Sequence, residues 1–112
     1  MILKKKHRYI LAEGSRPFDC DSRTLEEEIC KGLLSFMGAK SYSKASPRIV
    51  KTMGRDSFIL RVARGSEREV ILALAFIKEL RGAKTGIYTL KTSGTIKSAE
   101  SYYANAFNKN WA

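Results

Sequence analysis

Residues 46–80 read SPRIVKTMGRDSFILRVARGSEREVILALAFIKEL, and this stretch decides the fold. Its first half predicts two strands, over residues 46–53 and 57–64, because apolar side chains recur at alternate positions in both runs. The residues between them, Gly54-Arg55-Asp56, are typical of a hairpin connection. We therefore expect the two strands to pair antiparallel.

The second half of the stretch predicts a helix that runs to about Arg81. The segment Ser66-Glu67-Arg68-Glu69 has the form of a capping box, and Gly82 stands where a helix commonly ends. The apolar run over residues 70–77 would by itself also fit a buried strand. The cap, the alanines and the length favour a helix.

N-terminal to residues 46–80, the sequence predicts one strand and one helix. Residues 6–13 form the strand, and apolar side chains on both of its faces indicate a central place in the sheet. Residues 24–37 form the helix, which opens with a second capping box, Thr24 with Glu27, and stops at Gly38.

Downstream, residues 86–92 predict a last strand and residues 96–108 a last helix. The order β-α-β-β-α-β followed by a helix predicts an α+β, ferredoxin-like (RRM-like) sandwich. It has an antiparallel four-stranded sheet with two helices on one face, and an extra C-terminal helix. We expect one domain over residues 1–112. RNA-recognition modules, small-molecule regulatory domains and small phosphatases share this fold, so it does not settle the function.

The charge gives the first functional signal. The chain has 21 Lys and Arg residues against 11 Asp and Glu residues, a net charge of +10. The excess is uneven: residues 31–64 hold eight basic residues and a single acid, Asp56. Such a surface attracts polyanions through long-range fields and counterion release, which favours a nucleic-acid partner over a merely basic soluble protein.

Residues suited to catalysis or to metal binding are scarce in the sequence. His7 is the only histidine, and Cys20 and Cys30 are the only cysteines. They form neither a CxxC motif nor a Cys/His cluster, and no nucleophile or nucleotide-binding glycine loop is recognisable. We expect no catalytic residue, no metal site and no cofactor in this chain. The sequence does not decide whether Cys20 and Cys30 form a disulfide.

The candidate RNA-binding residues are basic side chains that can contact phosphates, together with Tyr9 as a lone stacking aromatic. Arg8, Arg61 and Lys91 would lie close together if they share a face of the sheet. The full set is Lys4, Lys5, Lys6, Arg8, Tyr9, Arg48, Lys51, Arg61, Arg64, Lys91, Ser93, Gly94, Thr95 and Lys97.

The segment Ser93-Gly94-Thr95-Ile96-Lys97 is the sharpest local feature. It joins the last strand to the last helix, where free N–H groups, two hydroxyls and Lys97 would suit a phosphate. The alternative interpretation is a simple helix cap provided by Thr95. The residues alone leave both open.

The helix after residue 66 carries apolar residues away from its core face. They are Ile71, Leu72 and Ala75. A helix at the surface is usually polar there, so either another element or a protein partner must cover them. We favour a partner. The chain shows no signal peptide and no apolar run long enough to span a membrane, so we expect a cytoplasmic protein without membrane contact.

Several stretches resemble archaeal ribonuclease P protein component 2, a family shared with a eukaryotic ribonuclease P/MRP subunit. They are residues 6–10 (KHRYI), residues 90–97 (LKTSGTIK), and the basic strand followed by Ser66, Arg68 and Glu69. The resemblance covers nearly the whole chain in order and length.

The resemblance implies a protein subunit that lacks catalytic residues and supports the RNA of ribonuclease P in removing the 5′ leader of precursor tRNA. In such an enzyme the RNA carries the active site and its metal ions. It also implies that the chain pairs with component 3, in an assembly that can be a heterotetramer, and meets precursor tRNA indirectly. The alternatives are a small-molecule-sensing regulatory domain and an acylphosphatase-like enzyme, for which Gly14-Ser15-Arg16 is a weak match.

Overall fold

The computed structural model describes the backbone of residues 6–109 and the side chains of residues 6–105. Its elements, in chain order, are β1 (His7–Gly14), α1 (Ser22–Met37), α2 (Ala39–Ala45), β2 (Arg48–Met53), β3 (Ser57–Ala63), α3 (Glu67–Ala75), β4 (Glu79–Leu80), β5 (Ala83–Lys84), β6 (Ile87–Ser93) and α4 (Ile96–Lys109).

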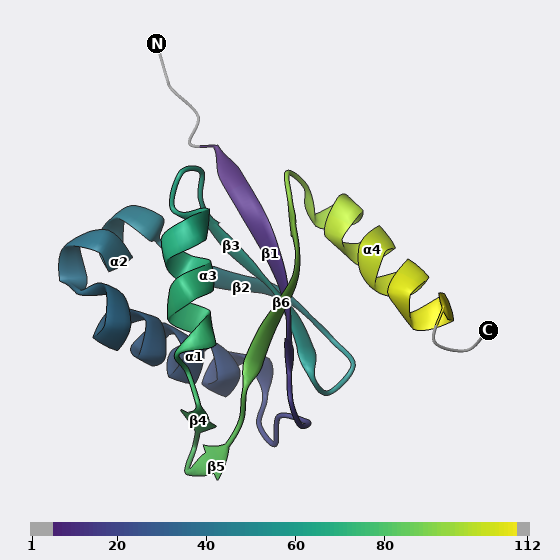
Figure 1. Cartoon of the computed structure of the whole chain (residues 1–112), viewed down its shortest axis with the longest axis horizontal. Coiled ribbons are helices and arrows are strands. Elements are labelled where there is room, and N and C mark those ends of the chain that lie inside the picture. The colour runs from purple at the N-terminus through teal and green to yellow at the C-terminus, as the bar shows by residue number, and fades with distance from the viewer. Residues whose placement is uncertain (1–5, 110–112) are drawn as a thin grey trace.

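The main sheet has the strand order β2-β3-β1-β6, and its neighbouring strands are antiparallel. This confirms the predicted ferredoxin-like arrangement. Helices α1, α2 and α3 lie on one side of the sheet and α4 lies on the other (Figure 1).

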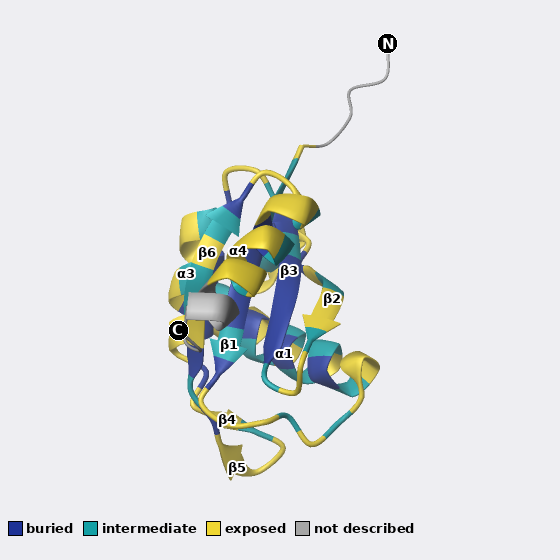
Figure 2. Cartoon of the chain, turned by 90° about the vertical axis from the view of Figure 1, so that its right-hand side faces the viewer, coloured by how far each residue is buried: buried dark blue, intermediate teal, exposed yellow. Residues whose placement is uncertain are grey.

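Two apolar clusters explain why β1 and β3 occupy the centre of the sheet. The larger cluster fills the space between the sheet and helices α1 and α3, and includes Ile10 and Phe58. The smaller one joins Leu11 and Ile59 to Ala99 of α4. Both central strands are therefore buried on both faces (Figure 2). The central place predicted for the first strand is confirmed.

The first helix begins earlier than predicted and uses a different cap. Asp21 is the N-cap residue, and its side-chain oxygen accepts a hydrogen bond of 2.8 Å from the Thr24 N–H. Hydrogen bonding from the Thr24 side chain, and then from its backbone N–H, also lowers the pKa of the Asp21 carboxyl. The predicted capping box of Thr24 and Glu27 is therefore wrong, because Thr24 already lies inside the first turn. The predicted end at Gly38 is confirmed.

The second helix is shorter than the sequence predicts. α3 ends at Ala75, and the short strands β4 and β5 form a hairpin where we predicted helix up to Arg81. Arg81 and Gly82 both adopt positive φ angles, 52° and 80°, which suit a tight hairpin turn. Gly82 thus makes a strand turn and does not stop a helix.

The chain returns to the core directly after α3 ends. Ile77 is buried in the main cluster after the chain leaves the helix. It lies against Gly32 of α1, where an added Cβ would come within 2.9 Å of the Ile77 side chain. Gly32 therefore leaves the space that the Ile77 side chain fills.

The remaining differences between prediction and structure are small. Ser66 is the N-cap residue of α3 but makes no side-chain cap, so the second predicted box does not form. The Glu67 carboxylate instead accepts a hydrogen bond from the Gly65 N–H. The short helix α2 was not predicted. β2 begins at Arg48, because Ser46 is the C-cap residue of α2 and has a positive φ of 45°.

Candidate nucleic-acid interface

The strand register brings most of the predicted RNA-binding residues to one end of the sheet. Tyr9 pairs with Arg61 on one side and with Ser93 on the other, and Arg61 pairs in turn with Arg48. The starts of β1 and β2 and the ends of β3 and β6 therefore meet. We call this region the basic end; its residues are Lys6, Arg8, Arg48, Arg61, Arg64, Lys97 and the segment 93–95.

Arg8 links two loops of the basic end. Its Nε lies 3.9 Å from Oε2 of Glu67 at the start of α3. Its Nη1 lies 3.9 Å from the place where a side chain at Gly94 would begin, so the guanidinium also lies beside the β6–α4 loop. Arg64 is joined to the same region through its N–H, which donates to the Lys6 carbonyl at 3.0 Å.

Glu67 is the acid that opposes these cations. Its own backbone N–H and that of Gly65 lower the pKa of its carboxyl, and Arg8 and Arg64 lower it further. Because the Glu67 carboxylate stays charged, it attracts the guanidinium groups of Arg8 and Arg64 and neutralises part of their charge. It also competes with any phosphate that approaches Arg8.

The helix-cap interpretation of residues 93–97 is confirmed. The Thr95 hydroxyl accepts a hydrogen bond of 3.1 Å from the Ser98 N–H, and so caps α4. The Ser93 side chain is buried, and its hydroxyl donates to the Thr95 carbonyl at 3.2 Å. A phosphate at this loop would therefore meet Gly94 and Lys97 rather than the Ser93 hydroxyl.

Arg8 does not share a face of the sheet with Arg61 and Lys91, so that condition of our prediction is not met. Arg8 pairs with Val62, which is buried on the α1 and α3 side. Arg61 shares the α4 side with Ile59, and Lys91 shares it with Leu11. The basic end therefore presents cations from both faces of the sheet.

Arg61 and Tyr9 lie under the edge of α4. The Arg61 Nε is buried and has no hydrogen-bond partner among the described residues. Tyr9 packs half-buried against the smaller apolar cluster. Helix α4 thus occupies the sheet face on which RNA-recognition modules stack bases. The basic end therefore suits contacts with phosphate groups better than base stacking.

Lys51 and Lys91 lie away from the basic end and hold α4 against the sheet. The Lys51 Nζ lies 2.8 Å from Oε2 of Glu100, and the Lys91 Nζ lies 5.6 Å from the centre of the Tyr102 ring. Their charges are partly engaged within the chain. Lys4 and Lys5 lie outside the described residues.

Exposed apolar residues gather where α3 lies beside α1. Leu72 is 54% exposed, Phe76 57% and Phe36 44%, and the two rings stack with their centres 4.6 Å apart. Ala75 is exposed beside them, whereas Ile71 is half-buried against the core. We call Leu72, Ala75, Phe76 and Phe36 the apolar ridge. The sequence by itself did not single out either phenylalanine, because both fall inside predicted helices and their stacking depends on the contact between two elements.

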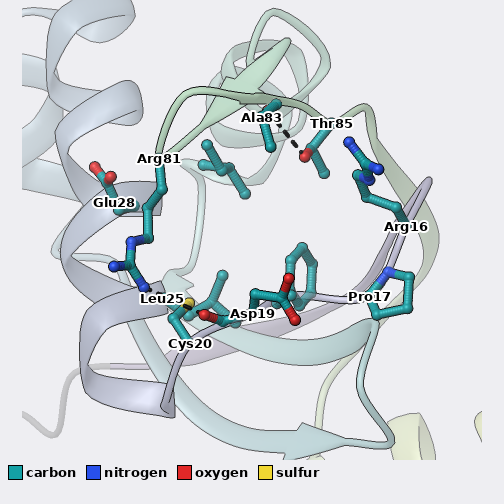
Figure 3. Close-up of a pocket in the computed structure, with 11 residues that line it drawn as sticks. Arg16, Pro17, Asp19, Cys20, Leu25, Glu28, Arg81, Ala83 and Thr85 are labelled. Atoms are coloured by element: carbon teal, nitrogen blue, oxygen red, sulfur yellow. Dashed lines mark hydrogen bonds between the residues drawn. The ribbon is translucent and has the colours of Figure 1, made fainter.

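The opposite end of the sheet holds a cavity of about 340 Å³ between the β1–α1 loop and the β4–β5 hairpin. Arg16 and Arg81 lie on opposite sides of it (Figure 3). The guanidinium of Arg81 donates to the Asp19 carbonyl at 3.2 Å, and that of Arg16 donates to the Lys84 carbonyl at 3.5 Å. Both groups are therefore tied to the backbone of the cavity wall.

In the β1–α1 loop, three backbone N–H groups that an acylphosphatase-like anion site could use are already engaged within the chain. The N–H of Gly14 donates to Asp56, that of Ser15 to Gly86 and that of Phe18 to Arg55, at 2.7 to 2.8 Å. The weak match of residues 14–16 thus has no support in the loop geometry.

Within residues 6–105, no three His, Cys, Asp or Glu side chains gather as a metal site. Cys20 and Cys30 are free thiols, and burial raises the pKa of the Cys30 thiol, which keeps it protonated. No helix in the described part of the chain is long and apolar enough to cross a membrane.

Comparison with known proteins gives concordant matches. The model of the Rpp14/Pop5 family matches residues 8–104. A protein of Thermococcus gammatolerans named Ribonuclease P protein component 2 is 36% identical over 98 residues, which are 85% of this chain and 80% of that protein. The protein of the same name from Thermococcus kodakarensis is 34% identical over 98 residues, with the same coverage.

A solved structure supports the fold. A chain in the cryo-EM structure of yeast Ribonuclease MRP superimposes with a TM-score of 0.61 at 10% identity. The match covers 98% of this chain and 95% of that one.

Proposed function

The chain belongs to the Rpp14/Pop5 family, and from this premise we propose that it is a protein subunit of ribonuclease P. In this role it contributes no catalytic residue and supports the catalytic RNA in removing the 5′ leader of precursor tRNA. The metal ions of the reaction belong to the RNA. The relatives named Ribonuclease P protein component 2 support the assignment.

The observation that carries the proposal is the basic end. Strand pairing alone gathers cations from β1, β2 and β3 there, and the start of α4 adds Lys97. Each cation that neutralises a phosphate releases counterions, so the end binds an RNA backbone with little preference for sequence. This is the property that a protein needs in order to let RNA helices pack closely.

The apolar ridge is the proposed contact with a second protein, component 3. Three large side chains exposed between 44% and 57% on adjoining helices form a patch of the kind that protein partners cover. Each copy of the chain would bind one copy of component 3, and two such pairs can form a heterotetramer. Precursor tRNA would be met through the RNA subunit.

Reconstitution tests the proposal directly. Ribonuclease P RNA, component 3 and this chain are combined, and the cleavage of precursor tRNA is followed as the Mg²⁺ concentration is lowered. We expect cleavage at low Mg²⁺ to depend on this chain, because its cations replace part of the metal ions that screen the phosphates. Equal cleavage with and without the chain at every Mg²⁺ concentration would contradict the proposed function.

A variant with Arg8, Arg64 and Lys97 all changed to Ala links the activity to the basic end. It removes three cations from loops and strand ends and leaves both apolar clusters intact. We expect it to require more Mg²⁺ than the wild type for the same rate. A variant with Lys31, Lys40 and Lys44 changed to Ala removes the same charge from α1 and α2, and should behave more like the wild type.

A further inference from the structure

We propose that the outer edge of β6 receives an extended segment of a partner protein, which adds a fifth strand to the sheet. β6 is the terminal strand in the order β2-β3-β1-β6, and it is seven residues long. The inference goes beyond the proposed contact at the apolar ridge, and it rests on the proposed function for the identity of the partner, component 3.

Hydrogen bonds at the end of β1 fix which of its residues point toward β6. The Gly14 N–H donates to the Asp56 carbonyl at 2.7 Å, on the side away from β6. The next residue, Ser15, donates to the Gly86 carbonyl at 2.8 Å, on the β6 side. Because backbone directions alternate along a strand, Glu13 points toward β6 and Ala12 points away from it.

The register then identifies the outward groups of β6. Tyr88 pairs with Glu13, so its N–H and carbonyl point inward to β1. Ile87 pairs with Gly14 and Thr89 with Ala12, so their N–H and carbonyl groups point outward. No other strand of the described chain pairs with this side of β6. These outward groups are ready to pair with an added strand.

The other edge of the sheet, formed by β2, is protected against the addition of a strand. Of the two edges, only that of β6 is therefore open to a partner strand among the described residues. At β2 the Ile49 N–H donates to Oε2 of Glu26 at 2.7 Å, so a side chain of α1 occupies the position that an added strand would need. The pairing of β2 is also irregular between Ile49 and Lys51. Side-chain blocking and bulges both disfavour strand addition at that edge.

A groove beside β6 would receive alternate side chains of the added strand. It is lined by Ala75 and Ile77 at the end of α3 and by Ile87 and Tyr88 of β6. Tyr88 is 58% exposed. An apolar side chain that projects from the added strand toward the α3 side would enter this groove, since side chains of a strand alternate between the two faces.

The charge around the edge defines the occupant further. Lys78 and Lys84 line the groove with Glu79, and Lys91 is exposed on β6 itself. The net positive charge favours a segment that carries acidic residues next to its apolar ones. A second copy of this chain is disfavoured at this edge, because it would bring the same lysines together.

Amide hydrogen exchange of the chain, alone and bound to component 3, tests the proposal. The Tyr88 amide already bonds to β1 and serves as the internal control. We expect exchange at Thr89 to slow by at least about tenfold in the complex, with little change at Tyr88. If Thr89 exchanges at the same rate in both states while component 3 is bound, the edge is not used and the inference is wrong.

Two variants at one position test the same contact by affinity. Thr89→Pro removes an outward N–H and leaves the pairing with β1 in place, whereas Thr89→Ala keeps the N–H. We expect Thr89→Pro to weaken binding of component 3 by about tenfold relative to Thr89→Ala, since the proline cannot donate a hydrogen bond to the partner.

Equal affinity of the two variants would overturn the inference and leave the proposed function standing. If wild-type chain does not bind component 3 at all, the proposed partner is wrong, and the inference falls with it. Exchange at Thr89 is measured in the wild-type chain, so a folding defect of the proline variant cannot decide the outcome.

Discussion

Arg8 shows how one side chain can serve both the fold and the proposed interface. It lies between Glu67 and the β6–α4 loop, with 37% of its side chain exposed. It therefore helps to hold two loops together and still presents charge to the outside. Arg61 is placed differently, with its Nε buried and unpartnered in the described structure.

Single substitutions at the basic end should act on RNA affinity through phosphate neutralisation. For Arg8→Ala, Arg61→Ala and Lys97→Ala we expect weaker binding to ribonuclease P RNA. The slope of log K against log salt concentration should shrink by about 0.7 to 0.9 for each phosphate that is no longer neutralised. Binding is measured at several salt concentrations. Lys51→Ala is the control, because Lys51 already pairs with Glu100. Wild-type affinity and slope in all three variants would rule out the basic end.

The Glu67 carboxyl should make stability depend on pH. Backbone N–H groups and the nearby arginines lower the pKa of this carboxyl in the folded chain below its usual 4.5. Its contribution to the free energy of unfolding is therefore fully present above pH 4.5. It is lost as the pH falls through the lowered folded pKa. We expect wild type to exceed Glu67→Gln in urea midpoint at pH 7, with the difference shrinking below pH 4.5. A difference that is as large at pH 3 as at pH 7 would contradict this account.

At the scale of elements, α3 and α4 shape the two proposed binding surfaces. α3 buries Val70, Ala73 and Leu74 in the core and leaves the apolar ridge outside. α4 buries Ala99 against Leu11 and Ile59 and so closes the second face of the sheet. Because α4 closes this face, the proposed RNA contacts are confined to the end of the sheet.

The apolar ridge should bind component 3 through α3. We expect Leu72→Glu to weaken this binding by about tenfold or more, because a charge would be buried in an apolar contact. Binding is measured by calorimetry, and circular dichroism confirms the fold. Leu34→Glu is the matched control. Leu34 is 42% exposed on α1, but it does not line the shallow groove that Phe36 and Phe76 border on the apolar ridge. Equal effects of the two substitutions would argue against the ridge.

At the scale of the whole molecule, the proposed binding surfaces occupy separate regions. The basic end gathers cations where the strands β3 and β6 finish, and the apolar ridge lies over α1 and α3 (Figure 1). RNA and a protein partner can therefore be bound at the same time without sharing residues. This separation suits a subunit that joins a protein to an RNA.

The isolated chain should have no nuclease or phosphatase activity. The described residues gather no metal-binding group, and in the β1–α1 loop the N–H groups of Gly14, Ser15 and Phe18 donate to backbone carbonyls. Protein freed of RNA is incubated with precursor tRNA and Mg²⁺, and separately with acyl phosphate. We expect product at the buffer rate in both assays. Metal-dependent cleavage by RNA-free protein would overturn this expectation.

The sequence by itself determined the order of the four sheet strands and of the helices α1, α3 and α4, the antiparallel sheet and the central place of the first strand. Alternation of apolar residues and the Gly54 turn are local signals that survive in any context. It also identified the basic residues, and it offered the Thr95 cap as one of two open interpretations of residues 93–97. The sequence therefore showed which residues carry positive charge, but it did not show which of them lie together in space.

Only the tertiary structure decided three other features. It ended α3 at Ala75 and placed Ile77, just beyond the helix, beside Gly32 of α1. It set the register, which separates Arg8 from Arg61 and Lys91 across the sheet. It also stacked Phe36 on Phe76 from two helices. Each depends on contacts between residues far apart in the chain, and such contacts leave no periodic signal in the sequence around either residue.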